Sequence, residues 1–412
     1  GYRREKRVIM KILVINSGSS SIKYQLFEVT DGNDEYEVLA RGQADRIGIT
    51  GSTLEQKRSD GAKLHRYGEI KDHKQAINGI LEMLQDPEKG VLQSLDDLWG
   101  VGHRVVHGGE DFTRSVRINK AVVKAIRKNA DLAPLHNPPN LMGIQAVYEI
   151  LPDISQVAVF DTAIHQTMPR RAYMYGLPRE QYKNYRIRRY GFHGTSHGYV
   201  AGEAAGVLGR PLRELKIITC HLGNGGSITA FEGGKSIDTS MGFTPLAGIV
   251  MGTRSGDLDP YIPLHMMENE GLSVSQVSAI MNKQGGLLGI CGRRDMRDIR
   301  SAVVEGDRDA AEAVEMYVYS IQKYIGAYAA AMNGVDAIVF TAGVGENEHH
   351  IRASVLENFG FLGLKVDVEA NRNHETVITT ADSAVAALVI HTDEELVIAR
   401  DTYRLISEAK AE

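Results

Sequence analysis

Two loops decide the fold of this chain: Asn16-Ser-Gly-Ser-Ser-Ser21 and His221-Leu-Gly-Asn-Gly-Gly-Ser227. Each loop follows a short apolar segment that is typical of a buried strand. Glycine permits tight turns and close backbone approach, while backbone amides and serine hydroxyls donate hydrogen bonds to phosphate oxygens. Taken alone, the first loop is more typical of an ordinary serine-rich hairpin turn. Two of them at matched positions predict a nucleotide-binding fold.

The elements expected around the two loops occur in the same order in both halves of the chain. In each half a strand hairpin surrounds the loop, and two further strands follow after helical segments. Ligands bind at the carboxyl ends of strands in α/β sheets, so polar loops at those ends indicate a ligand site. The expected strands are residues 8–15, 24–29, 98–106 and 156–160, then 215–220, 227–231, 336–340 and 386–390.

Helical patterns separate these strands at residues 74–84, 140–151 and 309–332. A last helix is expected to begin at Thr392, because Thr392 and Glu395 have the spacing of a capping box. A repeat of this size indicates duplication of a domain rather than a solenoid. We therefore predict an α/β fold of two duplicated domains with an inter-domain active-site cleft. The expected domains are residues 1–164 with 395–412, and residues 165–394.

Composition excludes several classes of partner. The 412 residues carry a formal net charge of -5, which gives no general attraction for nucleic acid or for anionic membranes. The two cysteines, Cys220 and Cys291, lie in no CxxC or Cys/His cluster, so neither a disulfide framework nor a zinc site is expected. No apolar run approaches the ~20 residues of a membrane span, and the basic start lacks the pattern of a signal peptide. A cytoplasmic protein is expected.

Two arginines lie within glycine-rich segments. Arg104 is part of Gly102-His-Arg-Val-Val-His-Gly-Gly109, and Arg254 is part of Met251-Gly-Thr-Arg-Ser-Gly-Asp257. The planar guanidinium group grips a carboxylate or a phosphate with two parallel hydrogen bonds. A surface salt bridge is the other interpretation of each arginine. The surrounding glycines favour a ligand, because they leave room for one to approach.

Several histidines lie beside glycine or proline, among them His136, His193 and His221. Each one alone is more typical of a hydrogen-bonded structural residue than of a catalyst. His193 and His197 have the spacing of a metal-binding pair on one helix face. The glycines around His193 argue against a helix at that point, so a zinc site is not expected.

These segments together resemble the acetate kinase family. The resemblance rests on residues 15–23, 102–109, 161–165, 189–197, 241–257 and 340–347, and it extends from Met10 to the C-terminal helix. It implies the fold shared by acetate and sugar kinases, Hsp70 and actin, with duplicated actin-like (ribonuclease H-like) domains, and a homodimer. It also implies reversible transfer of the ATP γ-phosphoryl group to acetate, giving acetyl phosphate and ADP, with Mg²⁺ and with Mn²⁺ as a substitute.

The resemblance also implies roles for individual residues. Arg104 and Arg254 bind the carboxylate and the transferring phosphoryl group, which His193 contacts, with His136, His221 and Asp161 close by. Asn16 and Glu394 place the metal ion. Direct transfer agrees with this set, because acetate is already ionised near pH 7 and needs no strong general base. The expected nucleotide-binding residues are Ser19, Ser21, Lys23, His221, Leu222, Gly223, Asn224, Gly225, Asp295, Met296, Arg297, Gly343, Val344, Gly345, Glu346 and Asn347.

The family match places Val106, Leu135, Phe192 and Pro245 around the methyl group of the substrate. One methylene changes discrimination by only ~1–3 kcal/mol, so acetate is expected as the preferred substrate and propionate as a slower one. A kinase for propionate or another short-chain acid is the alternative within the class. An actin-like or Hsp70-like protein that uses nucleotide to change conformation is the alternative from another class.

The sequence departs from the family pattern near the expected adenosine site. Arg293 and Arg294 stand where small serine-like residues are usual, and Gly226 stands where alanine is usual. The two arginines bear on nucleotide preference, since a charged side chain changes what can lie beside the nucleoside.

Overall fold

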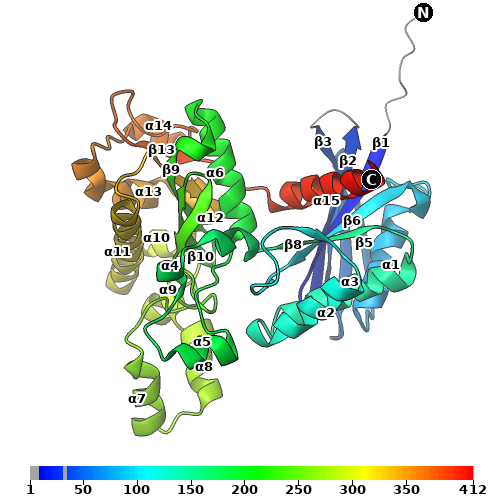
Figure 1. Ribbon diagram of the computed structural model, residues 1–412, viewed down its shortest axis with the longest axis horizontal. Helices are drawn as coiled ribbons and strands as arrows, with labels where there is room; N and C mark the ends of the chain where they lie inside the picture. The colour runs from blue at the N-terminus through cyan, green and yellow to red at the C-terminus, as the bar shows by residue number, and fades with distance from the viewer. Residues whose placement is uncertain (1–8, 31–34, 412) are drawn as a thin grey trace, which may run out of the picture. The chain divides into compact units, whose positions relative to one another are not determined.

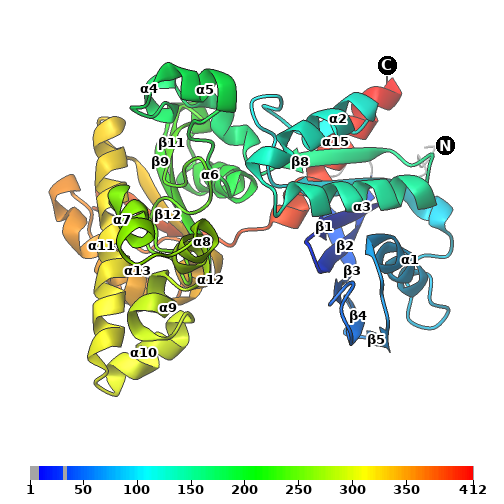
Figure 2. The same cartoon turned by 90° about the horizontal axis from the view of Figure 1, so that it is seen from below.

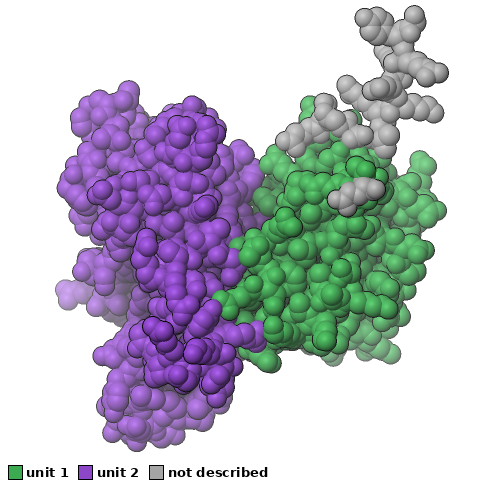
Figure 3. All heavy atoms as spheres, in the orientation of Figure 1, with its two compact units in different colours: residues 1–163, 393–412 green, residues 164–392 purple. Residues whose placement is uncertain are grey.

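The computed structural model describes residues 9–30 and 35–411. Val8, the first residue of the strand predicted over residues 8–15, lies outside them. The chain divides into two compact units (Figure 3). Unit 1 is Gly1–Ala163 with Asp393–Glu412, and unit 2 is Ile164–Thr392. Glu394 therefore belongs to unit 1.

Unit 1 is built on a sheet with the strand order β5-β4-β3-β2-β1-β6-β8-β7. Strand β1 pairs antiparallel with β2 and parallel with β6, and β6 pairs parallel with β8. The apolar run at the start of the chain forms β1, which is central in the sheet and almost entirely buried. The strands are β1 (Ile9–Ser17), β2 (Ser21–Thr30), β3 (Tyr36–Asp45), β4 (Ser52–Arg58), β5 (Lys63–Gly68), β6 (Leu98–Val105), β7 (Val116–Arg117) and β8 (Gln156–Phe160).

Helices cover both faces of this sheet (Figure 1). Leu13 and Ile15 of β1 face a cluster formed with α1 (His73–Leu84) and α3 (Asn137–Ile150), and α2 (Lys120–Lys128) packs beside α3. Ile12 and Val14 face the other side, where Ile398 and Ala399 of α15 (Glu394–Ala411) cover them. The alternation of β1 side chains thus places the C-terminal helix against the N-terminal strand.

Unit 2 repeats the central part of this arrangement. Its sheet has the order β11-β10-β9-β12-β13, which matches β3-β2-β1-β6-β8 strand for strand in pairing and direction. The predicted duplication is therefore confirmed, whereas β4, β5 and β7 extend only the first sheet. The strands are β9 (Lys216–Leu222), β10 (Gly226–Glu232), β11 (Lys235–Thr239), β12 (Ala337–Thr341) and β13 (Ala386–Val389).

Two long helices, α6 (Gly194–Leu208) and α11 (Arg308–Ala331), cover the faces of the second sheet (Figure 2). Alanines of α6 pack closely on Ile217 and Phe231, because small side chains let the helix approach the strands. Shorter helices surround this core: α4 (Arg170–Tyr173), α5 (Arg179–Tyr185), α7 (Tyr261–Asn269), α8 (Val274–Lys283), α9 (Gly286–Cys291), α10 (Met296–Val304), α12 (Ala342–Asn347), α13 (His349–Leu356) and α14 (Val368–Arg372).

The last helix begins two residues later than predicted. The Leu396 amide donates to Asp393 Oδ1 at 2.9 Å, so Asp393 caps the helix. The Thr392 hydroxyl instead lies 2.7 Å from Ser196 Oγ, within unit 2. The prediction of a Thr392–Glu395 capping box is wrong, because Asp393 caps the helix and the Thr392 amide donates to Glu346 Oε1.

We expect Gly102→Ala to destabilise unit 1. A Cβ atom at Gly102 of β6 would lie 2.4 Å from Thr402 Oγ1 and 2.6 Å from Ile398 Cγ2 of α15. Such overpacking costs about 1–3 kcal/mol and should lower the thermal unfolding midpoint. Gly202→Ala is the matched control, because a Cβ atom at this exposed position of α6 meets nothing within 4 Å. Gly102→Ala with a wild-type midpoint would contradict the close docking of α15.

Candidate active site

The parallel strands of unit 1 bring three predicted residues to one edge of the sheet. Asn16 lies near the end of β1, Arg104 near the end of β6, and Asp161 directly after β8. Arg104 Nε donates to Asp161 Oδ1 at 3.1 Å and Nη2 donates to Oδ2 at 2.6 Å. The charge of the buried Asp161 raises the pKa of Arg104, so the guanidinium stays charged. This two-point contact uses one edge of the guanidinium and leaves Nη1 on the other side.

Glu394 joins this edge from the first turn of α15. Burial raises the pKa of the Glu394 carboxyl to about 7, against the opposing effect of Arg104. Its Oε1 atom is buried and has no hydrogen-bond partner among the described residues. A buried carboxylate oxygen without a donor carries a desolvation cost that a cation or a donor would relieve.

Sequence reasoning missed two asparagines that hold this edge together. Asn140 Oδ1 accepts from the Val106 amide at 3.0 Å, and Asn140 Nδ2 donates to the Ser17 carbonyl at 2.8 Å. Asn137 makes the corresponding pair of hydrogen bonds with the backbone of His107. The two residues bracket Pro138 and Pro139 at the start of α3, and that pattern was the available signal.

The remaining predicted residues of unit 1 differ in exposure. Val106 is buried, whereas Leu135 is 73% exposed and His136 stands exposed at the start of α3. The first loop closes through a 2.7 Å hydrogen bond from the Gly18 amide to the Ser21 carbonyl, and the side chains of Ser19 and Lys23 are exposed beside it. The loop is therefore a tight, accessible turn at the end of β1.

In unit 2, two polar groups converge on the glycine loop. A Cβ atom at Gly225 would lie 3.2 Å from Arg254 Nη1 and 3.8 Å from His193 Nε2. Gly225 therefore leaves both groups open to the same small space. Arg254 is half-buried and its side chain makes no ion pair or hydrogen bond among the described residues, and burial lowers its pKa.

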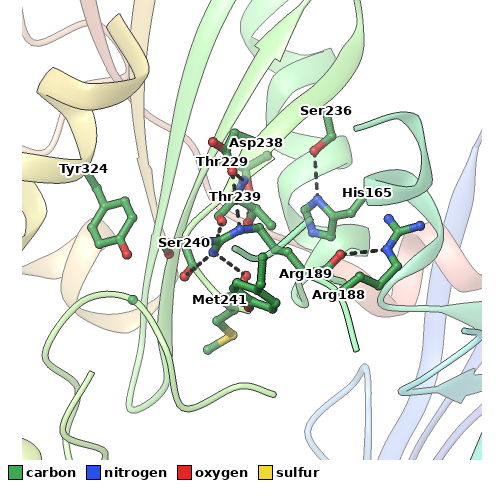
Figure 4. A network of polar contacts seen from close by, with 12 residues as sticks. His165, Arg188, Arg189, Thr229, Ser236, Asp238, Thr239, Ser240, Met241 and Tyr324 are labelled. Carbon is green, nitrogen blue, oxygen red and sulfur yellow. Dashed lines mark hydrogen bonds and ion pairs between the residues drawn. The ribbon is translucent and has the colours of Figure 1, made fainter. Parts of the chain in front are cut away.

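The loop that carries Arg254 is fixed at both ends. Arg189 Nη1 donates to the carbonyls of Thr239, Ser240 and Met241 at 2.9–3.2 Å, which holds the start of the loop (Figure 4). Asp257 holds its end, because Oδ1 accepts from the Gly248 amide at 2.8 Å and Oδ2 accepts from the Tyr324 hydroxyl. Loop residues that carry function are commonly held by a rigid scaffold in this way.

A helix does begin directly after His193, contrary to our expectation. His193 has the left-handed conformation with φ of 54°, and α6 starts at Gly194, so His197 lies in its first turn. The glycines allow the sharp entry into the helix and do not prevent it. Phe192 is buried, and its carbonyl accepts from His165 Nε2 at 2.9 Å; Pro245 is half-buried in the Arg254 loop.

A cavity of about 620 Å³ opens beside the glycine loop of unit 2. Half of the residues predicted to bind nucleotide line it, and they come from the ends of β9 and β12 and the start of α10. Arg294 also lines it, whereas Arg293 turns to Asp307 at 2.8 Å. Its lining is Gly223, Asn224, Arg294, Asp295, Met296, Arg297, Gly343, Val344, Asn347 and Glu348.

The other predicted nucleotide residues are not part of this lining: Ser19, Ser21 and Lys23 belong to unit 1, and His221, Leu222, Gly225, Gly345 and Glu346 lie elsewhere in unit 2. Leu222 is fully buried in β9 and Gly345 is buried within α12. Glu346 Oε1 accepts from the Ala342 and Thr392 amides at 2.8 and 3.2 Å, and Oε2 lies 2.6 Å from His391 Nδ1. Glu346 therefore joins the end of β12 to the segment after β13.

The residues of unit 1 fit a magnesium ion held largely through water. No group of three or more His, Cys, Asp or Glu side chains among residues 9–30 and 35–411 could enclose a metal ion. Mg²⁺ commonly binds through one or two carboxylates together with substrate phosphates. The unpartnered oxygen of Glu394 supplies such a carboxylate at the edge where β1 carries Asn16.

Within the part of the chain that the structure describes, no helix is both long and apolar enough to span a bilayer.

Two sheets of one topology, each with a turn or glycine loop after its first strand, define the class of duplicated actin-like α/β proteins. The particular family follows from comparison with known proteins. The model of the acetokinase family matches residues 11–400, so the chain belongs to that family.

Relatives cover almost the whole chain. A protein named acetate kinase from Carboxydothermus hydrogenoformans is 54% identical over 96% of this chain and 99% of its own length. The crystal structure of Porphyromonas gingivalis acetate kinase superposes with a TM-score of 0.92 at 44% identity, covering 96% of this chain and all of that one. The crystal structure of a propionate kinase from Francisella tularensis superposes with a TM-score of 0.88 at 42% identity, and the match again covers 96% of this chain and all of that one.

We expect Glu394→Gln to stabilise the metal-free protein increasingly as the pH rises. The folded-state pKa is about 7 and the ordinary value is 4.5, so between these values the folded protein binds more protons than the unfolded chain. Its free energy of unfolding therefore falls with rising pH in this window, and glutamine abolishes that term. The free energies of unfolding of the two proteins, measured in EDTA, should diverge by roughly 1 kcal/mol or more from about pH 4.5 to about 7, then stay parallel.

Glu408→Gln is the matched control, because Glu408 lies exposed on the same helix. It should shift the midpoint little at any pH. A constant difference between Glu394→Gln and wild type across the window would contradict the burial of an ionised Glu394.

Proposed function

We propose that this protein transfers the γ-phosphoryl group of ATP to acetate, reversibly and with Mg²⁺, giving acetyl phosphate and ADP. The observation that carries the proposal is the Arg254 guanidinium, which is half-buried without an acidic partner among the described residues and faces the same glycine as His193 Nε2. A desolvated cation beside a hydrogen-bond donor is stabilised by an anion. Membership of the acetokinase family supports a phosphoryl group as that anion.

Unit 1 supplies the groups for the carboxylate substrate and the metal ion. Arg104 is oriented by Asp161, so its remaining N–H groups bind acetate in one direction. Asn16 and Glu394 would hold Mg²⁺ through water, and the ion would neutralise charge on the phosphate oxygens. No proton has to be removed from acetate. These residues therefore position the substrate and neutralise the charge on the phosphate oxygens.

Unit 2 supplies the groups for the nucleotide. The cavity beside Gly223 and Gly343 accepts the nucleoside, and the glycine loop lets phosphates approach the backbone. Arg254 and His193 then donate to the transferring phosphoryl oxygens. Donors placed before the reaction stabilise the charge that spreads over those oxygens in the transition state. The expected cleft between the two domains stays a prediction.

The oligomeric state, the cellular location and the use of a second metal ion are further parts of this proposal. We propose a homodimer, supported by exposed apolar side chains on neighbouring helices of unit 2: Tyr261, Ile262 and Leu264 of α7, and Val274 of α8. We also propose a cytoplasmic location and the use of Mn²⁺ in place of Mg²⁺.

We expect Arg254→Ala to lower kcat by about 10²-fold or more while the protein stays folded, because it removes a donor to the phosphoryl group. Arg104→Lys should also lower kcat strongly, since lysine keeps a charge for the buried Asp161 but loses the planar fork. The measurement is acetyl-hydroxamate formation from ATP, acetate and hydroxylamine. Arg210→Ala is the control, because Arg210 forms an exposed ion pair with Asp336. Near-normal turnover of Arg254→Ala would remove its assigned role.

The same assay separates the alternative from another class. An actin-like or Hsp70-like protein would bind nucleotide and yield no hydroxamate from well-folded wild-type protein.

Substrate preference gives a second test. We expect kcat/KM to fall from acetate to propionate to butyrate, and Val106→Ala to raise the propionate-to-acetate ratio about ten-fold, because one methylene is worth ~1–3 kcal/mol. Val122→Ala, on the solvent-facing helix α2, is the control and should leave the ratio unchanged. A wild-type preference for propionate would favour the propionate kinase alternative.

A further inference from the structure

We propose that Thr219, His197 and Ser227 form a hydrogen-bonded chain that fixes the tautomer of His193, so that its Nε2 carries the proton and donates on the ligand side. The proposal rests on the phosphoryl-binding role of His193 proposed above. It assigns positioning residues for that role, none of which touches a ligand. Together with His193 they form what we call the tautomer chain.

The tautomer chain is continuous in the structure. Thr219 Oγ1 lies 2.6 Å from His197 Nδ1, and His197 Nε2 lies 2.7 Å from Ser227 Oγ. Ser227 Oγ in turn lies 2.9 Å from His193 Nδ1. The first three residues are fully buried, so no solvent competes for these contacts.

Strand register places the chain on one face of the second sheet. Thr219 and His221 are two residues apart in β9, so their side chains lie on the same face of the sheet. Ser227 pairs with His221 across the hairpin. The first turn of α6 covers this face, which brings His197 between Thr219 and Ser227. Residues distant in sequence thus meet because of pairing that the hairpin enforces.

The direction of the hydrogen bonds follows from counting protons. His197 is neutral, because burial and the neighbouring His221 and His165 lower its pKa well below the ordinary value, so it carries one ring proton. The Thr219 hydroxyl has no second partner among the described residues, so it must donate its proton to His197 Nδ1. The opposite direction would bury an unsatisfied hydroxyl proton at a cost of about 1–3 kcal/mol.

The directions of the other hydrogen bonds in the tautomer chain follow from this first donor. His197 Nδ1 accepts, so His197 Nε2 carries the proton and donates to Ser227 Oγ. Ser227 then has its own proton left for His193 Nδ1. His193 Nδ1 accepts, so in the neutral ring the proton stands on Nε2, the atom that faces Gly225 beside Arg254 Nη1. His221, stacked on His193 at 4.2 Å, limits rotation of the ring.

Holding an imidazole in one tautomer matters because the other tautomer presents a lone pair to the ligand. A lone pair facing a phosphoryl oxygen repels it, whereas an N–H donates to it. A buried partner that only sets a tautomer can therefore change turnover without contacting a ligand.

The test compares two replacements of Thr219. Thr219→Val keeps the side-chain shape and removes the donor, whereas Thr219→Ser keeps the donor. We expect Thr219→Val to lower kcat about ten-fold or more with KM values changed less than about two-fold, and Thr219→Ser to restore kcat. Ser236→Ala is the matched control. It removes a buried serine–histidine contact of 2.9 Å, to His165 in the same unit (Figure 4), that lies outside the tautomer chain.

The tautomer itself is read from two-bond ¹H–¹⁵N correlation spectra of ¹⁵N-histidine-labelled protein, with His193 assigned by its loss in His193→Gln. We expect wild type and Thr219→Ser to show His193 protonated at Nε2, and Thr219→Val to lose that signature. A wild-type His193 protonated at Nδ1 would overturn the proposal, and so would equal kcat or unchanged His193 signals in Thr219→Val. Near-normal kcat in His193→Gln would instead overturn the functional role of His193.

Discussion

Parallel pairing of the central strand in each sheet is the constraint on which the site depends. Because β1, β6 and β8 run in the same direction, their carboxyl ends carry Asn16, Arg104 and Asp161 to one edge. The same pairing of β9 with β12 places the glycine loop next to the start of α12. Within each sheet, a side chain at the end of one of these strands therefore lies near those at the ends of the neighbouring strands, whatever the distance along the chain.

Each of the two units has a charged group without full compensation among the residues of its proposed site. Arg104 and Asp161 satisfy each other, whereas Arg254 has no acidic partner among the described residues and Glu394 keeps a buried oxygen without a donor. Such groups lower the stability of the ligand-free protein, because desolvated charge is costly. They persist at functional sites because a ligand of opposite charge relieves the cost when it binds. Glu394 in unit 1 therefore favours a cation or a donor beside it, and Arg254 in unit 2 favours an anion.

A group of buried, uncharged polar residues in the second unit orients a side chain. Under the first turn of α6, the face of the sheet is lined by threonine, serine and histidine in place of the apolar side chains that lie under the rest of the helix. Satisfied buried networks of this kind define side-chain orientation strongly, because any other arrangement leaves a proton or a lone pair unpaired. In our proposal, this network fixes the orientation and tautomer of the His193 imidazole.

Local sequence determined eight strands, the helix α11 and the duplication, since apolar runs, glycine loops and strand order are local signals, as residues 12–15 and 215–220 show. It did not reveal β3, β4, β5, β7 or β11. It also marked Arg104, Arg254 and the glycines beside them. It did not reveal that Asp393 caps α15, because two adjacent polar residues can each cap the same helix and geometry selects between them. It did not reveal the helix after His193 or the asparagines of α3. Only the tertiary structure decided which polar groups pair, since Thr219, His197 and Ser227 meet through packing of a helix on a hairpin.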